Sequence, residues 1–226
     1  MSPAIKIKAA RESSIQASRQ QDSRTRILEA ALQVIRTKGY NACRIEDVCA
    51  AAGLTKGGFF HHFKSKEEMA VAAVDFWVEI TGALFRSAPY HEPSDPVDRL
   101  LAYVDFRKAL LQGELPQYTC LVGTMTQEIY ITHPGIREAA NRSIVGHAKT
   151  LVSDVEAAML ERRVRGDWTA ESLALYTQAT IQGAFILAKA GGGVAVASAC
   201  MDHLRRYLEL LFVPCQKPIT LSLEVV

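Results

Sequence analysis

Apolar residues recur at intervals of three and four along almost the whole chain from about residue 22 onward, and this spacing constrains the fold most strongly. Ile27, Ala31, Val34 and Ile35 are one example. Such spacing places apolar side chains on one face of an α-helix, whereas a half-buried strand needs a period of two. We see no strand-rich region and no internal repeat. The sequence therefore predicts an all-α fold.

Capping residues and glycines divide this pattern into separate predicted helices. We expect Asp22 or Ser23 to cap the first helix and Gly39 to end it. Thr55 and Ser65 are expected to cap two later helices. The predicted helices cover about residues 22–38, 44–52, 55–63, 65–89, 96–112, 120–132, 134–165, 169–190 and 195–212. A run of three glycines separates the last two.

Charge is distributed unevenly. Residues 1–66 contain twelve Lys/Arg and five Asp/Glu, a net charge of +7, and the rest of the chain carries −5. Residues 1–21 mix Ser, Gln, Ala, Lys and Arg without clear periodicity, which is typical of a mobile basic arm. A basic first third on an acidic remainder indicates a polyanion-binding module attached to a body with another task. Charge alone fits a solvated basic face equally well.

Several classes of protein are not expected. The five cysteines are scattered, odd in number and form no CxxC pair, so neither a disulfide framework nor a structural zinc site is predicted, and a reducing cytosol fits best. They are Cys43, Cys49, Cys120, Cys200 and Cys215. No secretion signal and no apolar run of membrane-spanning length is apparent. No cofactor is predicted.

Two short predicted helices joined by a turn at residues 52–54 form a helix-turn-helix. In this motif the second helix lies in the major groove of DNA. Thr55 is expected to cap that helix and reach a phosphate, and Lys56 to contact phosphate or guanine. Phe59 is expected to contact a thymine methyl. The residues assigned to DNA contact or its support are Arg44, Thr55, Lys56, Gly57, Gly58, Phe59, Phe60, His61, His62 and Lys66.

The run TRILEAALQVIRTKGYNACRIEDVCAAAGLTKGGFFHHFKSKEEM, residues 25–69, resembles the DNA-binding domain of the TetR family of transcriptional repressors. The resemblance implies a three-helix domain over residues 22–68 and a helical effector-binding and dimerisation domain over 69–226. It also implies a cytoplasmic homodimer on an operator of double-stranded DNA, with a small-molecule effector and no membrane. Phe60 departs from the family, which usually has a Tyr there that contacts phosphate.

The adjacent histidines are not expected to bind metal. Neighbouring positions on a helix point about 100° apart, and His ligands on a helix usually stand four residues apart. The resemblance places one of His61 and His62 toward the DNA backbone and the other toward the adjoining helices. Lys64 and Lys66 are expected to face phosphates.

The second part of the chain is expected to form the effector pocket and the dimer interface. Residues 170–190 are apolar around most of the helix, as a helix buried against both a core and a partner would be. The resemblance implies that the last two long helices form the dimer contact, and this apolar surface is consistent with it. Pocket candidates combine aromatic surface with a few polar groups, although core packing is an alternative for each. They are Tyr103, Phe106, Cys120, Met125, Tyr130, His147, Gln182 and Phe185.

Cys120 is a candidate sensor as well as a pocket residue. It lies at a predicted helix N-terminus, where the helix dipole favours a thiolate, and Lys189 interrupts an apolar helix that could lie near it. The stretches TCLVGTMTQE and HPGIREA also resemble a subgroup with electrophile-responsive repressors. Cysteine is often buried and inert, so both interpretations stay open.

The function predicted from these features is a ligand-responsive, DNA-binding transcriptional repressor. One alternative is a thiol-based electrophile or redox sensor acting through Cys120. Another is an architectural DNA-binding protein without an effector, although such a protein would need only the basic part. An enzyme is not predicted, since no GxSxG, HExxH or phosphate-binding glycine loop occurs.

Overall fold

The computed structural model describes residues 22–212, and every regular element in that range is helical. The first helix includes residues 22–38, and it is followed by α2 (Ile45–Ala52), α3 (Lys56–His62) and the long α4 (Lys66–Arg86). The remaining elements are η1 (Pro89–His91), α5 (Pro96–Ala109), α6 (Leu115–Tyr118), α7 (Leu121–Ile129), α8 (Pro134–Lys149), α9 (Val152–Glu161), α10 (Ala170–Leu187), η2 (Ala188–Gly192) and α11 (Gly193–Leu211). The predicted all-α class is confirmed.

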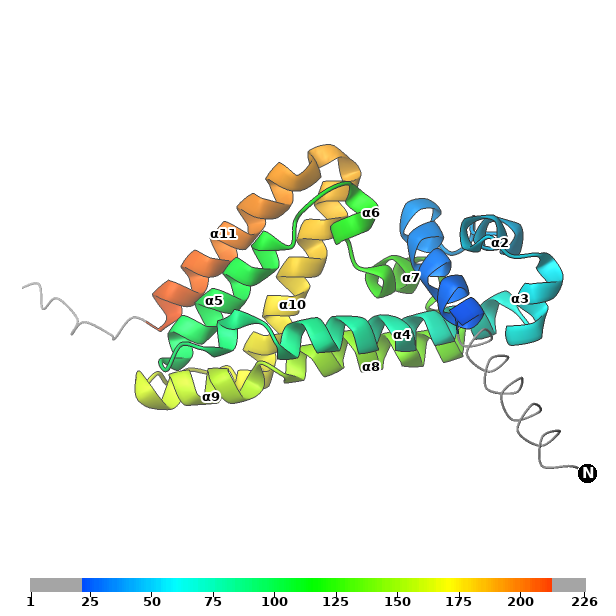
Figure 1. Ribbon diagram of the computed structural model, residues 1–226. Coiled ribbons are helices and arrows are strands. Elements are labelled where there is room, and N and C mark those ends of the chain that lie inside the picture. Colours follow the sequence, from blue (N-terminus) through cyan, green and yellow to red (C-terminus); the bar gives the residue numbers. More distant parts are fainter. Residues whose placement is uncertain (1–21, 213–226) are drawn as a thin grey trace, which may run out of the picture.

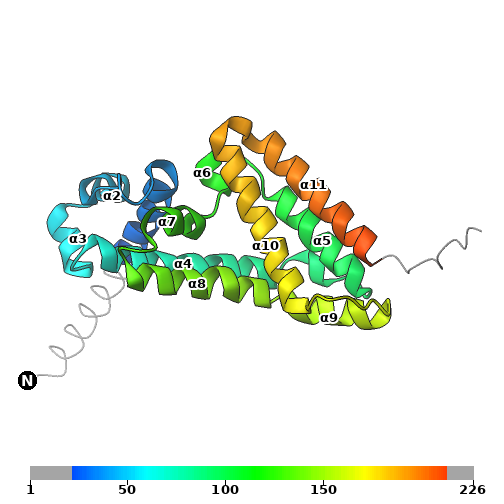
Figure 2. The same ribbon diagram turned by 180° about the vertical axis from the view of Figure 1, so that it is seen from behind.

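The molecule is elongated, with α4 and α8 side by side along its length (Figures 1 and 2). The first helix, α2 and α3 lie at one end, and α5, α9, α10 and α11 lie at the other. Buried residues form two clusters, one at each end. The start of α4 contributes Met69 and Ala73 to the first cluster, and its last turn contributes Phe85 to the second. One continuous helix therefore belongs to both cores.

Part of the C-terminal region packs into the N-terminal core. Leu121, Val122, Met125 and Ile129 of α7 are buried in the same cluster as the first helix, α2 and α3. Ile136, Ala139 and Ala140 of α8 join it as well. The first hydrophobic core therefore continues across residues 68 and 69, where the sequence predicts a domain boundary.

The predicted helix over residues 134–165 is wrong. The structure divides it into α8 and α9, with a tight turn between them at Thr150 and Leu151. The Thr150 hydroxyl donates to the carbonyl oxygen of His147 (2.7 Å), and the Leu151 amide donates to the carbonyl of Ala148 (3.0 Å). Leu151 is buried, so the turn directs an apolar side chain into the second core. Thr is able to offer the backbone such a local partner, which helical periodicity does not reveal.

The helix starts predicted at Thr55 and Ser65 agree with the structure. The Thr55 hydroxyl accepts from the Gly58 amide and the Ser65 hydroxyl from the Glu68 amide, both at 3.1 Å. The first helix differs, because residues 22 and 23 are already helical and neither caps it. The predicted basic arm, residues 1–21, lies outside the described residues.

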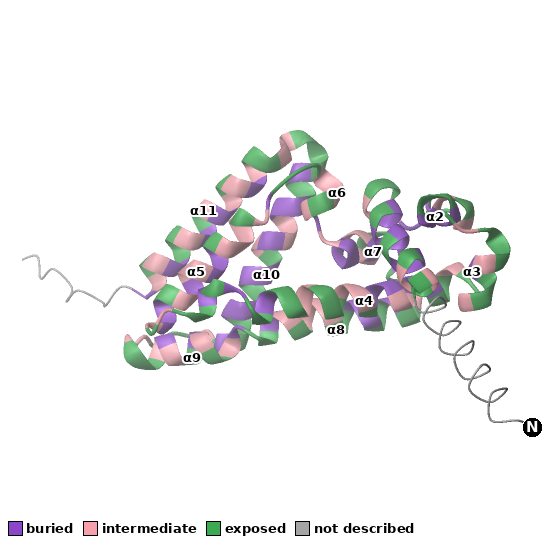
Figure 3. Cartoon of the chain, viewed as in Figure 1, coloured by how far each residue is buried: buried purple, intermediate pink, exposed green. Residues whose placement is uncertain are grey.

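The last two long helices form a hairpin (Figures 1 and 2). The chain reverses at the predicted glycine run, where Gly191 has φ 120° and Gly193 has φ 56°. Within Ala170–Leu211, one 18-residue window has a mean hydropathy of 1.6, which by length and composition alone would suffice to cross a membrane, and 28% of that window is buried in the protein. After the reversal, α11 packs against α5 and α10 packs against α8 and α9, and buried residues of both helices belong to the second core. Figure 3 shows exposed and intermediate residues continuing along α11.

Candidate functional site

The turn between α2 and α3 is held from both sides. Gly53 adopts a left-handed conformation (φ 63°), which glycine tolerates without steric cost, and the Leu54 amide donates to the carbonyl of Cys49 (2.9 Å). Arg26 of the first helix donates to the carbonyl of Ala52. At the start of α2, the Arg44 amide donates to the Asp47 carboxylate (3.2 Å). These contacts fix the angle at which α3 leaves the domain.

The phenylalanines of α3 and its C-cap divide between the core and the surface. Phe59 and Phe63 are buried, at 0% and 2% exposure, and they anchor the helix to the first core. Phe60 is 47% exposed, and His61 and Lys56 are exposed beside it. The expected contact of Phe59 with a thymine methyl is therefore wrong, because its side chain is enclosed by protein. Phe60, the next residue along the helix and about 100° away around its axis, presents its aromatic ring to solvent.

The adjacent histidines lie in different environments. His62 Nε2 and the Ser23 hydroxyl are 2.7 Å apart, so His62 joins α3 to the first helix. Burial lowers the pKa of His62, and His61 and Arg24 lower it further. His61 is exposed. Between residues 22 and 212, no three His, Cys, Asp or Glu side chains gather as a metal site would require.

Lys66 holds the fold together. Its ammonium donates to the carbonyl oxygens of Tyr40 (2.8 Å) and Cys43 (3.0 Å) and lies 4.2 Å from the centre of the Tyr40 ring. The expectation that Lys66 faces phosphates is wrong, because its charge is directed into the loop between the first helix and α2. Lys64 is exposed, and Lys56 forms only a solvent-exposed ion pair with Glu46 (2.7 Å). Exposed pairs of this kind exchange readily for another anion.

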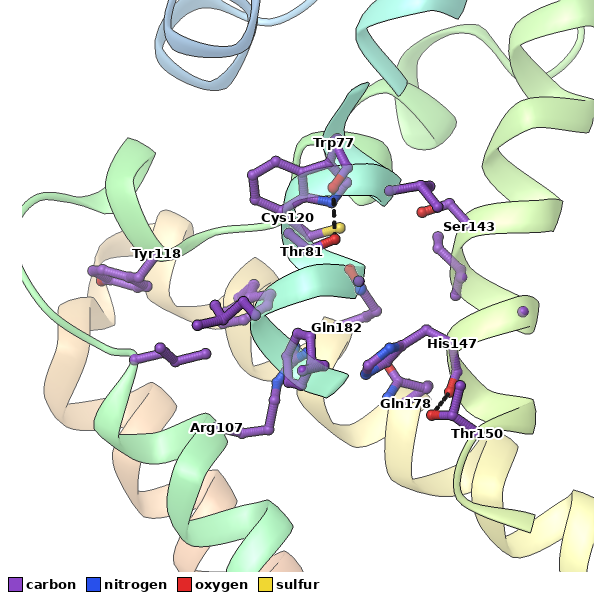
Figure 4. Close-up of a pocket in the computed structure, with 18 of the residues that line it drawn as sticks. Trp77, Thr81, Arg107, Tyr118, Cys120, Ser143, His147, Thr150, Gln178 and Gln182 are labelled. Atoms are coloured by element: carbon purple, nitrogen blue, oxygen red, sulfur yellow. Dashed lines mark hydrogen bonds between the residues drawn. The ribbon is translucent and has the colours of Figure 1, made fainter. Parts of the chain in front are cut away.

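A cavity of about 430 Å³ lies in the body of the protein. Residues from α4, α5, α6, α8 and α10 and the N-cap of α7 line it, and Figure 4 shows their side chains converging on it. This volume is within the range, about 300–1,000 Å³, of pockets that hold small organic molecules. Its wall combines aromatic rings with scattered polar groups.

Four of the predicted pocket residues line this cavity: Cys120, His147, Gln182 and Phe185. Two others stand immediately behind it. Tyr103 is 1% exposed and bonded to His147, and Phe106 packs edge to face on Phe85 at 5.6 Å.

Two predictions are wrong. Met125 is fully buried in the first core, and Tyr130 is 52% exposed at the far end of α7. Lys189 lies close to Cys120 beside a minor hollow, with its ammonium on the Thr124 hydroxyl.

Several lining residues were not predicted, among them Trp77, Arg107, Tyr118 and Gln178. Arg107 was the hardest to foresee, since an arginine near a helix C-terminus is normally explained by solvation and the helix dipole. Trp77 lies in a long helix with many other apolar residues, so the sequence did not distinguish it as a pocket residue. Only the relative positions of four helices reveal that these residues share a cavity.

A hydrogen-bonded chain of three side chains closes one end of the cavity. Gln178 Nε2 donates to the Tyr103 hydroxyl (2.7 Å), and that hydroxyl lies 2.9 Å from His147 Nε2. Because the hydroxyl accepts from Gln178, it can donate its own hydrogen to His147 Nε2 in the tautomer that leaves this nitrogen unprotonated. Burial, with a smaller contribution from the nearby Arg107 charge, lowers the pKa of His147 to about 4. The imidazole is therefore neutral at physiological pH.

Polar contacts join the cavity wall to the N-terminal domain. Arg36 of the first helix donates to the carbonyl of Gln117 (3.2 Å), and its guanidinium carbon lies 5.1 Å from the Trp77 ring centre. At the far end of α7, the Glu128 carboxylate accepts from the amides of Tyr40 (3.2 Å) and Asn41 (2.8 Å). A helix that begins at a cavity residue, Cys120, thus ends on the loop that precedes α2.

Comparisons with known proteins match both parts of the chain. The family model "Bacterial regulatory proteins, tetR family" matches residues 27–73, and "Tetracyclin repressor-like, C-terminal domain" matches residues 96–204. The regulator CymR of Pseudomonas putida is 41% identical over 64 residues, which cover 28% of this chain and only 32% of CymR.

Longer matches extend across both parts of the chain. The repressor DhaR of Mycobacterium sp. (strain GP1) is 25% identical over 166 residues, which cover 74% of this chain and 82% of DhaR. The crystal structure of a TetR-family regulator from Agrobacterium tumefaciens superimposes with a TM-score of 0.74 at 23% identity. That superposition covers 85% of this chain and 98% of the other.

Substitutions of Lys66 and Lys64 should distinguish a lysine that stabilises the fold from a surface lysine that contacts DNA. Lys66→Met removes a charged donor from two backbone carbonyls, so we expect the free energy of unfolding to fall by about 1–3 kcal/mol in urea denaturation. Lys64→Met should leave unfolding unchanged but weaken binding to duplex DNA and lower the slope of log K against log salt concentration by about 1. Equal stability of the two variants would contradict the role given to Lys66.

Acid should destabilise the protein through His147. The pKa of His147 in the folded protein, about 4, lies below the ordinary value of 6.5. The neutral imidazole therefore contributes fully to the free energy of unfolding above pH 6.5, and this contribution is lost as the pH falls toward 4. The difference of about 2.5 pKa units corresponds to roughly 3–4 kcal/mol at about 1.36 kcal/mol per unit. His147→Gln does not titrate in this window. Its stability, measured by denaturant unfolding at each pH, should therefore fall less than that of the wild type between pH 6.5 and 4. Parallel pH curves would be inconsistent with a buried neutral imidazole.

Proposed function

Because the chain belongs to the TetR family of bacterial transcriptional regulators, we propose that it binds a palindromic operator as a homodimer and releases it when a small molecule fills the cavity. The observation that carries this proposal is the combination of an exposed helix-turn-helix face with a separate cavity joined to it by α4 and α7. Because its target is chromosomal DNA, we place the protein in the bacterial cytoplasm.

The exposed face of α3 has the composition of a recognition helix. Lys56, Phe60 and His61 point away from the core. A Cβ atom on Gly57 or Gly58 would meet nothing closer than 3.6 Å, so the fold itself does not demand glycine at either position. Close approach of a DNA backbone is a reason for their small size.

The remaining assigned residues support this face. Thr55 caps α3 and can donate its hydroxyl hydrogen to phosphate, and Arg44 is exposed at the start of α2. His62 orients the helix through Ser23. Phe60 has no hydroxyl, so in place of a hydrogen bond to phosphate it can offer apolar contact to a sugar or a thymine methyl.

The hairpin of α10 and α11 provides a surface for a second copy. Large apolar side chains on both helices are 42–75% exposed. A contiguous exposed patch of such side chains is unusual on a monomeric protein. They include Leu175, Tyr176, Leu187, Val194, Tyr207 and Leu210. The Tyr176 and Tyr207 rings lie 5.1 Å apart, so the two helices present one continuous face. A dimer would place two α3 helices on half-sites roughly 34–36 Å apart.

The response to a ligand requires differential binding. A small molecule shifts the equilibrium only if it binds the DNA-released arrangement more tightly than the DNA-bound one. Trp77 and Thr81 place the middle of α4 in the cavity wall, and Cys120 places the start of α7 there. A ligand that moves these residues acts on helices that also hold the N-terminal domain, through its core and through Glu128.

A second candidate is thiol sensing at the same cavity. Cys120 lines the cavity at the N-terminus of α7, where its sulfur accepts from the Gly123 amide (3.4 Å), and Lys189 lies nearby. An electrophile reaching the cavity would meet this thiol. Alkylation there would alter the start of α7 in the same way as a bound ligand.

Selection of bound duplexes from a random pool tests the proposal. A short palindrome is expected, and a panel of small molecules should then include one that releases the protein from that site. Binding without sequence preference and with a steep salt slope would instead indicate an architectural protein. Release by N-ethylmaleimide that disappears in Cys120→Ser would favour thiol sensing, and identical release in that variant would exclude it.

The dimer face makes a prediction with a matched control. Leu187→Glu puts a charge into the apolar face of α10, whereas Leu160→Glu changes a leucine that is 81% exposed on α9, away from that face. We expect sedimentation analysis to show a shift to monomer, and operator affinity to fall by about tenfold or more, only in the α10 variant. A dimer that withstands Leu187→Glu would argue against this interface.

A further inference from the structure

The charges lining the cavity are all of one sign. Among the described residues that line it, three are arginines, Arg86, Arg107 and Arg142, and none is an aspartate or glutamate. Arg142 is 62% exposed and lies 3.7 Å from the Asp75 carboxylate. Arg86 is exposed at the end of α4. Arg107 is the half-buried member, and no ion pair recorded between residues 22 and 212 includes it.

We propose that the effector is an organic anion, a carboxylate with an aromatic or aliphatic body, whose charged group binds Arg107. This inference rests on the proposed ligand response and names the chemical class of the ligand. The carboxylate would take the guanidinium edge, and the apolar body would fill the space between Trp77 and Phe185.

Aromatic rings hold the guanidinium and leave its edge available. The guanidinium carbon lies 5.2 Å from the centre of the Phe85 ring and 5.9 Å from that of Phe185. Figure 4 shows the side chain extending from α5 toward the other lining residues. The attraction of the cation to these ring faces does not use its N–H donors, which lie in the plane of the group. One interaction reaches the Tyr103 hydroxyl, and a guanidinium has five donors, so enough remain for a bidentate carboxylate.

The neighbouring polar groups do not neutralise this charge. His147 is neutral and is hydrogen-bonded to Tyr103, so it places no negative charge beside Arg107. Gln178 is committed to Tyr103 as well. An anionic ligand would therefore be the only negative charge within the lining. It would be desolvated there, where a charge-assisted hydrogen bond is strongest.

The same arrangement disfavours a cationic ligand. An aromatic cage for an ammonium group needs ring faces and a nearby acid or neutral surroundings. Here Phe85 and Phe185 already face the Arg107 guanidinium. A second cation would meet like charge without any lining carboxylate to offset it. A neutral ligand would gain only the apolar contacts.

Calorimetry on the full-length protein with matched ligands tests the inference. The probes are phenylacetate, 4-phenylbutyrate and hexanoate, together with the primary amide and the amine of each skeleton. At least one carboxylate should bind about tenfold or more tightly than its amide, with the amine weakest. Arg107→Met should remove that preference, and Arg107→Lys should keep its direction. Arg142→Gln, which changes an arginine already paired with Asp75, should leave it intact.

Each outcome bears on one of the two proposals. Circular dichroism melts establish that each variant is folded, and the two Arg107 variants provide independent readings. A panel in which no carboxylate outranks its amide, including one in which nothing binds, contradicts the anion site, as does an unchanged preference in Arg107→Met. Operator release by an amide or amine would contradict the anion site while supporting ligand response. Carboxylate binding through Arg107 without any effect on DNA binding would support the site and contradict the response.

Discussion

The continuity of α4 is the constraint on which the other features depend. Its 21 residues span about 31 Å at 1.5 Å per residue, from the helix-turn-helix to the far core. Met69 is buried at one end and Phe85 at the other, while Trp77 and Thr81 line the cavity between them. A packed helix transmits a displacement along its axis more readily than it bends, because interiors are dense. Any molecule that wedges between α4 and α8 therefore acts on both ends at once.

The fold was largely readable from the sequence because its signals are local. The apolar periodicity predicted the helices, and Gly39 and Gly53 predicted the turns that end the first helix and α2, since both residues adopt a positive φ. The helix starting at residue 134 was predicted too long because the turn at Thr150 uses a side-chain bond to the backbone, which leaves the apolar period almost unbroken. Helix type was thus predictable, whereas helix boundaries depended on single hydrogen bonds.

The candidate site was less predictable, because it depends on which face each side chain occupies. Phe59 and Phe60 are adjacent in sequence, yet one is enclosed and the other is 47% exposed. Lys66 has the charge of a phosphate ligand, but its ammonium donates to the nearby carbonyl oxygens of Tyr40 and Cys43. Met125 and Tyr130 are chemically plausible pocket residues on a helix whose start, not its middle, meets the cavity. Residue type narrows the candidates, and tertiary packing decides among them.

An unpaired arginine in the cavity wall links stability with the proposed response. The half-buried Arg107 guanidinium has two aromatic rings near it, and no carboxylate is recorded as its ion-pair partner between residues 22 and 212. A ligand that supplies the missing charge stabilises whichever arrangement of the helices encloses it, by RT ln(1 + [L]/Kd). If only one arrangement of the helices forms the Arg107 site, this gain favours that arrangement over the other, which is the differential binding that the proposed response requires.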